Sequence, residues 1–214
     1  VEEIVKFQKD IGVDVATMLD VFTRPDMTYS KVKEAVTETF NRGMPSIEIA
    51  QEMMLNGPIQ GGIFPELRAL SAKKMSELDF SVHPIGGIVP VMEQQKYTHL
   101  AKIMLATKSN LSPNRPVHMF GCGHPMLFPM LIGLGADLFD SAAYVLFARD
   151  GRLLTPWGTE KISEIDEWPM IMPSIANHTP AEVRKMNKED RTILLSRFNP
   201  VSYTHLRAHE TCPY

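Results

Sequence analysis

The sequence predicts an α/β fold built on a barrel of parallel strands, and three observations point to it. Short apolar segments alternate with longer amphipathic ones five times between residues 11 and 139. Nearly every apolar segment ends on Gly, Gln or Asp, and strand C-terminal ends form the active-site mouth of such a barrel. The competing fold, an open doubly wound sheet, would gather polar residues at one switch point instead.

The predicted barrel is incomplete. Five strand–helix units occupy about 130 residues, whereas a complete (β/α)8 barrel takes about 250, so we expect its first strands to be missing. The chain also opens at Val1 on a helical pattern without an initiator Met, which favours a fragment of a longer protein.

Composition is that of a soluble globular protein, with 44% hydrophobic and 22% charged residues. The net charge of −3 excludes a globally basic surface, so a nucleic-acid partner would need local patches. We expect a cytoplasmic protein with no membrane segment, since neither a long apolar run nor a signal peptide is visible. Cys122 and Cys212 form no disulfide framework.

Residues 201–214 resemble translated sequencing-adapter sequence and break the preceding helical period. We interpret them as a non-native tail and residues 1–200 as the catalytic domain. This removes His205 and His209 from any metal site.

The elements follow in order from local signals. An apolar run reaches Asp20, and a helix capped by Thr28 or Ser30 follows it, with Gly43 marking its end. Pro65 suits the first position of the next helix. The predicted strands cover 11–21, 54–59, 80–85, 116–120 and 137–139. The predicted helices cover 28–42, 65–78, 91–107 and 125–134.

The pattern changes after Tyr144. Residues 145–148 and 153–155 flank Asp150-Gly151, which predicts a β-hairpin inserted at the barrel rim. A closing helix is expected over 181–197, with an interruption at 187–189.

The strand-end residue Asp140 is the first catalytic candidate. Ser141, Ala142 and Ala143 follow it and leave room for a substrate above the carboxylate. Alternatively, Asp140 caps the next turn or forms an ion pair with a nearby basic side chain.

Together, the strand ends resemble the tRNA-guanine transglycosylases, most closely the archaeal archaeosine-type branch, over about residues 11–199. The matching motifs stand in family order: Leu19–Asp26, Gly57–Gly62 with Pro65–Arg68, Ile85–Glu93, Pro116–Met126, Gly135–Tyr144 and Leu154–Thr159.

The resemblance implies exchange of a guanine in the D arm of tRNA for the free base 7-cyano-7-deazaguanine. Asp140 would be the nucleophile at the ribose C1′, forming a covalent intermediate. A carboxylate suits a transition state that resembles an oxocarbenium ion.

The resemblance also implies a base pocket. Asp20 would accept from the paired N–H donors of a guanine edge, and Gln60 would contact the base carbonyl. Gly61 and the backbone N–H groups of Gly87 and Ile88 complete the expected substrate site. The structural alternatives are a helix cap for Asp20 and a turn-stabilising amide for Gln60. We interpret His118 as a barrel-core histidine.

Two departures from the family pattern matter. The family's acid–base Asp would precede Val1, so we expect the fragment to be inactive alone and to lack the archaeal C-terminal RNA-binding domains. The family's zinc ligands correspond to Met170, Met172, Ile175 and Phe198 in a subdomain over about 160–199. None supplies a thiolate or imidazole, so we expect no metal and an apolar cluster in its place.

The favoured function is therefore an archaeosine-type transglycosylase with tRNA and a 7-deazaguanine base as partners. Arg149 and Arg152 on the rim hairpin are phosphate-contact candidates, although a solvated charged turn fits them equally. A catalytically silent tRNA-binding paralogue or subunit, and an unrelated barrel glycosidase, stay open. The sequence allows a homodimer without determining it.

Overall fold

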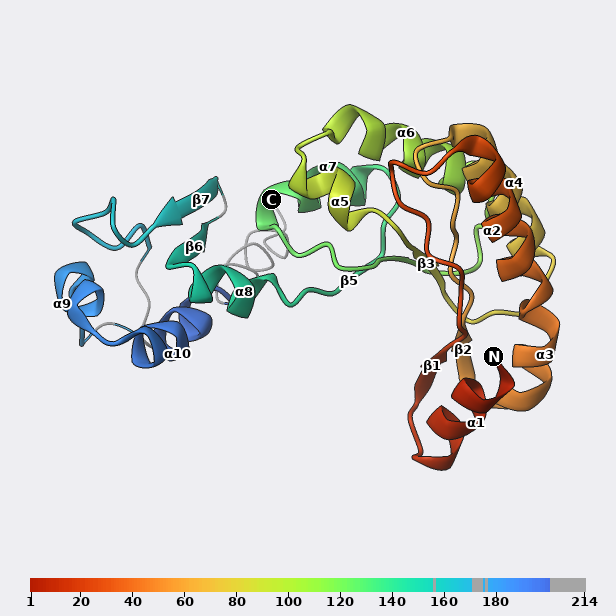
Figure 1. Cartoon of the computed structure of the whole chain (residues 1–214), viewed down its shortest axis with the longest axis horizontal. Helices are drawn as coiled ribbons and strands as arrows, with labels where there is room; N and C mark the ends of the chain where they lie inside the picture. The colour runs from red at the N-terminus through yellow and green to blue at the C-terminus, as the bar shows by residue number, and fades with distance from the viewer. Residues whose placement is uncertain (156, 171–174, 176, 201–214) are drawn as a thin grey trace, which may run out of the picture. The chain divides into compact units, whose positions relative to one another are not determined.

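The computed structural model describes residues 1–155, 157–170, 175 and 177–200 (Figure 1). The chain forms two compact units, which we describe separately. Unit 1 comprises Val1–Cys122 and Met130–Asp140, and unit 2 comprises Gly123–Pro129 and the chain from Ser141 onward.

Unit 1 is built on five short parallel strands. They are β1 (Val15–Thr17), β2 (Met54–Asn56), β3 (His83–Ile85), β4 (Val117–Met119) and β5 (Leu138–Phe139). Neighbours in the chain pair in parallel, and the bridges Asn56↔Val82 and Ile59↔Ile85 connect β2 to β3. The predicted strands are thus confirmed in order and direction. Among the described residues β1 and β5 do not pair, so this wall is open.

Helices cover unit 1, and Figure 1 shows α2, α3 and α4 in a row beside the first strands. Their bounds are α1 (Glu2–Asp10), α2 (Tyr29–Asn41), α3 (Gly43–Ala50), α4 (Pro65–Ser76), α5 (Val89–Glu93) and α6 (Tyr97–Lys108). Helix α7 (Phe128–Gly133) belongs to unit 1 from Met130 onward, and the 3₁₀ turn η1 (Pro125–Leu127) belongs to unit 2. Helices α2, α4 and α6 each bury several apolar side chains, for example Val32 and Val36 on α2. Burying one such side chain contributes roughly 1.5–3 kcal/mol, so these side chains hold the helices to the strands.

Two helix predictions in unit 1 are wrong in detail. The single helix expected over 91–107 is two helices, α5 and α6, separated by Gln95 with φ at 55°. Gly43 begins α3 instead of ending α2. A Cβ on Gly43 would collide with Leu78 and lie 3.4 Å from the Phe80 ring, so glycine there serves close packing.

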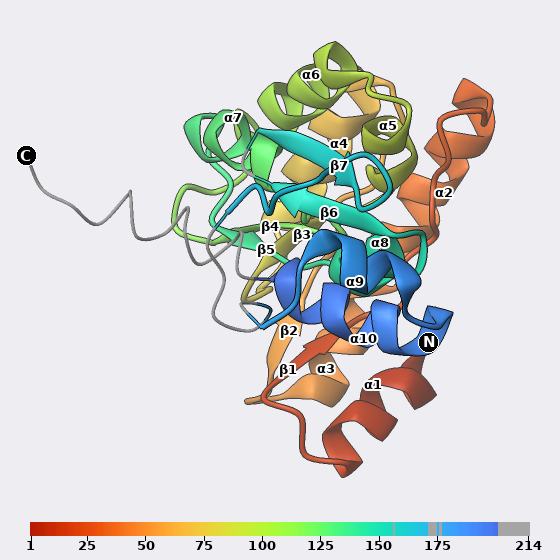
Figure 2. The same cartoon turned by 90° about the vertical axis from the view of Figure 1, so that its left-hand side faces the viewer.

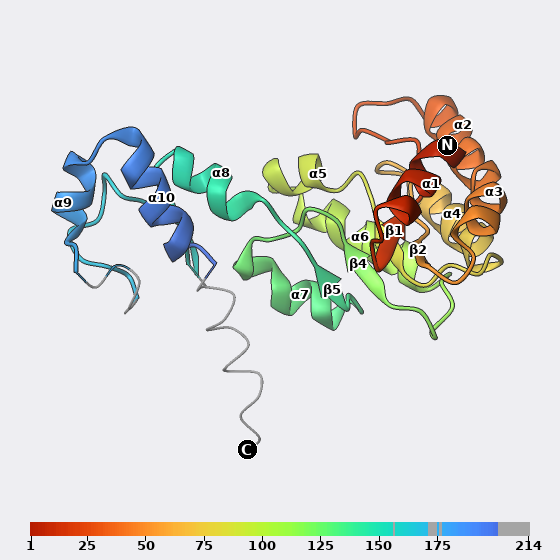
Figure 3. The same cartoon turned by 90° about the horizontal axis from the view of Figure 1, so that it is seen from below.

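Unit 2 contains α8 (Ala143–Arg149), β6 (Arg152–Thr155), β7 (Gly158–Lys161), α9 (Pro180–Lys185) and α10 (Lys188–Phe198). Figure 2 shows α10 beside α8, and Figure 3 shows both from another side. Asn187 caps α10 by accepting from the Asp190 N–H, so the predicted interruption of the closing helix is confirmed.

The hairpin predicted around Asp150-Gly151 is wrong. Residues 143–149 form helix α8, and the antiparallel pair lies one strand later, between β6 and β7. Gly151 has φ at 68° and donates its N–H to Ala148 O, so the Asp-Gly pair ends a helix. Within the described ranges, the helices all lack the length and apolarity that a bilayer span requires.

Candidate functional site

The strand ends of unit 1 bring the candidate residues to one edge. Asp20 follows β1, Gln60 follows β2, Gly87 follows β3, Gly121 follows β4 and Asp140 follows β5. Because the five strands are parallel, their C-terminal ends face the same side of the wall.

Asp20 and Gln60 are directly bonded. The amide nitrogen of Gln60 donates to Asp20 Oδ2 at 2.5 Å, and Gln60 is buried while Asp20 is partly exposed. The guanidinium of Arg42 donates to the backbone oxygens of Leu19 and Asp20 at 3.3 and 3.4 Å, which anchors the loop that carries the carboxylate. An acceptor and a donor therefore stand side by side, as the edge of a guanine-like base requires.

Glycines lie against this pair. A Cβ on Gly86 would collide with the Gln60 amide and lie 3.5 Å from Asp20 Oδ2, and one on Gly87 would lie 3.1 Å from Gln60 Oε1. Gly87 also has φ at +70°, which favours glycine. Within the described residues the N–H groups of Gly87 and Ile88 enter no hydrogen bond, so two backbone donors remain beside the pair.

Asp140 is about half exposed and lies between two groups of the β4 end. The N–H of Gly121 donates to Asp140 Oδ1 at 3.0 Å, and His118 Nε2 lies 3.0 Å from the same oxygen. Burial lowers the pKa of His118 below its ordinary 6.5, and the nearby Asp140 carboxylate only partly opposes this shift. The two atoms are close, but their arrangement does not meet the geometry of a hydrogen bond in this conformation.

Gly121 links the two halves of the site. A Cβ on Gly121 would lie 2.6 Å from Val89 Cγ2, and Val89 begins the helix that follows Gly87 and Ile88. Gly121, which bonds Asp140, thus packs against Val89, which continues the glycine loop beside Gln60.

A buried cation supports the loop that carries Gln60. Arg68 is completely buried on α4, where Nε donates to Gly62 O and Nη1 to Ile59 O, both at 2.9 Å. Burial lowers the pKa of Arg68 to about 9, which leaves the guanidinium charged at neutral pH. A Cβ on Gly61 would lie 2.7 Å from the Arg68 backbone nitrogen, so the loop and helix pack without room for a side chain.

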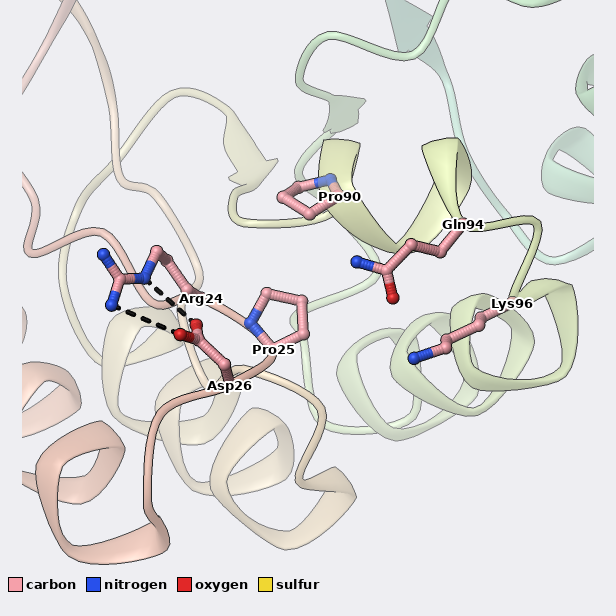
Figure 4. A pocket seen from close by; sticks show the side chains of 6 residues that line it. All are labelled: Arg24, Pro25, Asp26, Pro90, Gln94 and Lys96. Carbon is pink, nitrogen blue, oxygen red and sulfur yellow. Dashed lines mark hydrogen bonds and ion pairs between the residues drawn. The ribbon is translucent and has the colours of Figure 1, made fainter.

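An open pocket of about 260 Å³ lies between the loop after Thr23 and the helix after Ile88 (Figure 4). Arg24 lines it and is paired with Asp26 at 3.0 Å. Gln94 and Lys96 enter from the opposite wall (Figure 4), so amide and ammonium groups face the cavity. The remaining lining residues are Pro25 and Pro90.

The two arginine candidates lie in unit 2 on different elements. Arg149 is exposed at the end of α8, and Arg152 is the first residue of β6. Arg152 is paired with Asp150 at 2.9 Å, and its guanidinium lies 3.9 Å from the centre of the Phe147 ring.

The positions corresponding to the family's zinc ligands do not fit a zinc ion. Ile175 and Phe198 are buried in the apolar core of unit 2, and Met170 packs against it. Met172 lies outside the described residues. Zinc sites in proteins use thiolate, imidazole and carboxylate ligands, which these side chains lack. The described part of the chain also holds no cluster of three His, Cys, Asp or Glu residues suited to a metal.

Sequence reasoning missed three residues that the site uses. Thr23 bonds Gln60, Arg68 supports the Gln60 loop, and His118, interpreted as a core histidine, approaches Asp140. Only Thr23 had a local signal, since it follows Asp20 within the same motif. The other two are brought in by tertiary packing.

Comparison with known proteins identifies the family of the chain. The chain matches the family described as queuine tRNA-ribosyltransferase (TGT) over residues 1–209. It is 44% identical over 197 residues to the tRNA-guanine(15) transglycosylase of Thermococcus kodakarensis, covering 92% of this chain and 34% of that protein. It is 46% identical over 205 residues to the protein of the same name from Methanococcus aeolicus, with 92% and 31% covered.

The chain thus spans about a third of the length of these relatives. The match to the family extends over nearly the whole chain, and the relatives share close to half of the aligned residues. The chain belongs to the queuine tRNA-ribosyltransferase (TGT) family.

Proposed function

We propose that this protein is a cytoplasmic archaeosine-type tRNA-guanine transglycosylase whose five-stranded wall is part of a (β/α)8 barrel. The observation that carries the proposal is the bonded pair of Asp20 and Gln60 beside Gly86 and Gly87, at the same strand edge as Asp140. The names of the relatives point to the same reaction.

The base site would read a guanine-type edge. The Asp20 carboxylate accepts from the ring N–H and the exocyclic amine, and Gln60 donates to the neighbouring carbonyl. The backbone N–H groups of Gly87 and Ile88 supply further donors. The bound base would be guanine leaving tRNA or 7-cyano-7-deazaguanine entering it.

Asp140 would act as the nucleophile. A bond forms between its carboxylate oxygen and the ribose C1′ while the C1′–N9 bond to guanine breaks, and guanine leaves with the electron pair and takes up a proton. The incoming base then loses its N9 proton and attacks C1′, which releases Asp140 and leaves the tRNA backbone intact. The half-exposed side chain of Asp140 suits such an approach.

The tRNA must present its target nucleotide outside the helical stack. The pocket lined by Arg24, Gln94 and Lys96 lies next to Thr23 and Ile88 in the chain, and its polar groups would contact the ribose-phosphate of that nucleotide. Arg149 and Arg152 would contact phosphates further along the tRNA.

The test uses the protein at its full natural length with tRNA and radiolabelled guanine. Stable incorporation of label that is lost in Asp140→Asn supports the proposal. Tight tRNA binding without any incorporation would instead identify a silent tRNA-binding paralogue. Incorporation that survives in Asp140→Asn would remove Asp140 from the nucleophile's role.

A further inference from the structure

Thr23 joins the two chain segments that form the candidate base site. It is completely buried, and its hydroxyl donates to Gln60 Oε1 at 2.6 Å. The hydroxyl oxygen of Thr23 in turn accepts from the N–H groups of Gly62 at 2.9 Å and Gly61 at 3.4 Å. One side chain from the loop after β1 thus fixes both Gln60 and the loop that carries it.

The bonds around Gln60 determine which way its amide points. The backbone N–H of Thr23 lies 3.2 Å from Gln60 Oε1, and a backbone N–H can only donate. The amide oxygen must therefore face Thr23, and the amide nitrogen must face Asp20, whose carboxylate can only accept. The contacts of the amide oxygen and those of the amide nitrogen therefore require the same orientation of the Gln60 amide.

We propose that Thr23 is a positioning residue that sets the base specificity of this site, an inference that rests on the proposed function. By occupying the acceptor of Gln60, Thr23 leaves the amide with only N–H groups to offer a bound base. One hydrogen of the amide nitrogen bonds Asp20, and the second remains for a ring carbonyl. In a base such as adenine, an amino group replaces this carbonyl. Its N–H would face the N–H of Gln60 with no acceptor between them, so the site rejects such a base.

Close packing keeps the arrangement in place. A Cβ on Gly87 would lie 2.5 Å from Thr23 O and 3.4 Å from its hydroxyl oxygen, so the loop after β3 rests directly on Thr23. Gln60 itself is only 1% exposed. A turned amide would leave the buried hydroxyl and the buried Gly62 N–H poorly paired, which opposes the change.

The experiment compares guanine with 6-thioguanine, which keeps the ring N–H and the amine but replaces the carbonyl oxygen with the weaker acceptor sulfur. The variants are Thr23→Val, Thr23→Ser and the control Thr107→Val. Thr107 is equally buried, but its hydroxyl bonds Ile103 O within α6, away from the site. Each is assayed for guanine exchange at full natural length, and its thermal unfolding is recorded.

We expect Thr23→Val to raise the KM for guanine about tenfold, the effect of losing one buried hydrogen bond. Its kcat should change little because Asp140 is untouched, and its preference for guanine over 6-thioguanine should narrow. These changes should be partial, because the backbone N–H of residue 23 still donates to Gln60 Oε1 in the variant. Thr23→Ser should restore both values, and Thr107→Val should match the wild type.

An unchanged preference in a folded Thr23→Val protein would overturn the inference. So would an equal loss in Thr107→Val, or a failure of Thr23→Ser to restore the preference, because either result indicates general destabilisation. If the wild type exchanges no guanine, the proposed function fails; equilibrium dialysis of both bases against the same variants then decides the role of Thr23 separately. Dialysis that detects no binding to the wild type would overturn the inference as well.

Discussion

His118 Nε2 lies 3.0 Å from Oδ1 of Asp140, on the neighbouring parallel strand end. The register pairs His118 with Leu138, two residues before Asp140, and residues two apart on a strand point to the same face. Burial keeps the pKa of His118 below 6.5, so the imidazole is neutral at pH 7. A neutral imidazole then stands beside the proposed nucleophile without cancelling its charge.

This pair predicts an acid limb in the pH profile of exchange. As the pH falls through the lowered pKa of His118, the imidazole takes up a proton and its positive charge pairs with Asp140, which weakens the carboxylate as a nucleophile. His118→Gln should remove this limb, because the neutral amide of glutamine takes up no proton in this range. His99→Gln, on the exposed face of α6, is the control. An unaltered profile in His118→Gln would show that the imidazole has no part in the reaction.

Gly87→Ala tests the close approach of the β3 end to the proposed base site. Its new Cβ would lie 2.5 Å from Thr23 O, so the loop must shift and the KM for guanine should rise by about tenfold or more. Gly12→Ala is a matched control, because Gly12 has φ at +75° with nothing within 4 Å of a Cβ. Both variants carry similar backbone strain, so steady-state kinetics separate strain from collision. Equal KM values in the two variants would contradict the site's geometry.

Arg68→Met should destabilise unit 1 by about 1–3 kcal/mol, because Gly62 O loses its buried donor. The Gln60 loop would also loosen, so guanine affinity should fall with stability. Arg115→Met removes an exposed pair with Asp79 instead and should cost less than about 1 kcal/mol. Urea unfolding of both variants measures the difference. Equal unfolding free energies would mean that the buried guanidinium contributes no net stability.

Unit 2 should not depend on a metal. Treatment with a chelator is expected to leave the melting temperature unchanged, whereas Phe198→Ala should cost roughly 3–5 kcal/mol through the cavity it creates. Ile193→Ala, at a side chain that is 46% exposed on the same helix, is the control and should cost far less. Thermal unfolding with and without chelator, together with elemental analysis, decides the matter. One zinc per chain would refute the prediction.

Local pattern predicted much of unit 1. Apolar runs ending on polar residues identified five parallel strands, and Pro65 marked the start of α4, because these signals depend on neighbours within a few residues. The prediction of a hairpin around Gly151 was wrong because it too rested only on neighbouring residues. An Asp-Gly pair fits both a hairpin turn and a helix end, and only packing of the buried Ala148 selected the helix.

The sequence by itself determined the order and direction of the strands, the family resemblance and the candidate residues Asp20, Gln60 and Asp140, since motif and spacing are carried along the chain. Only the tertiary structure decided that Thr23 fixes the amide of Gln60 and that His118 approaches Asp140. Those contacts join residues 37 and 22 positions apart, by the differences 60 − 23 and 140 − 118. Their geometry depends on strand register and helix packing, which no local pattern specifies.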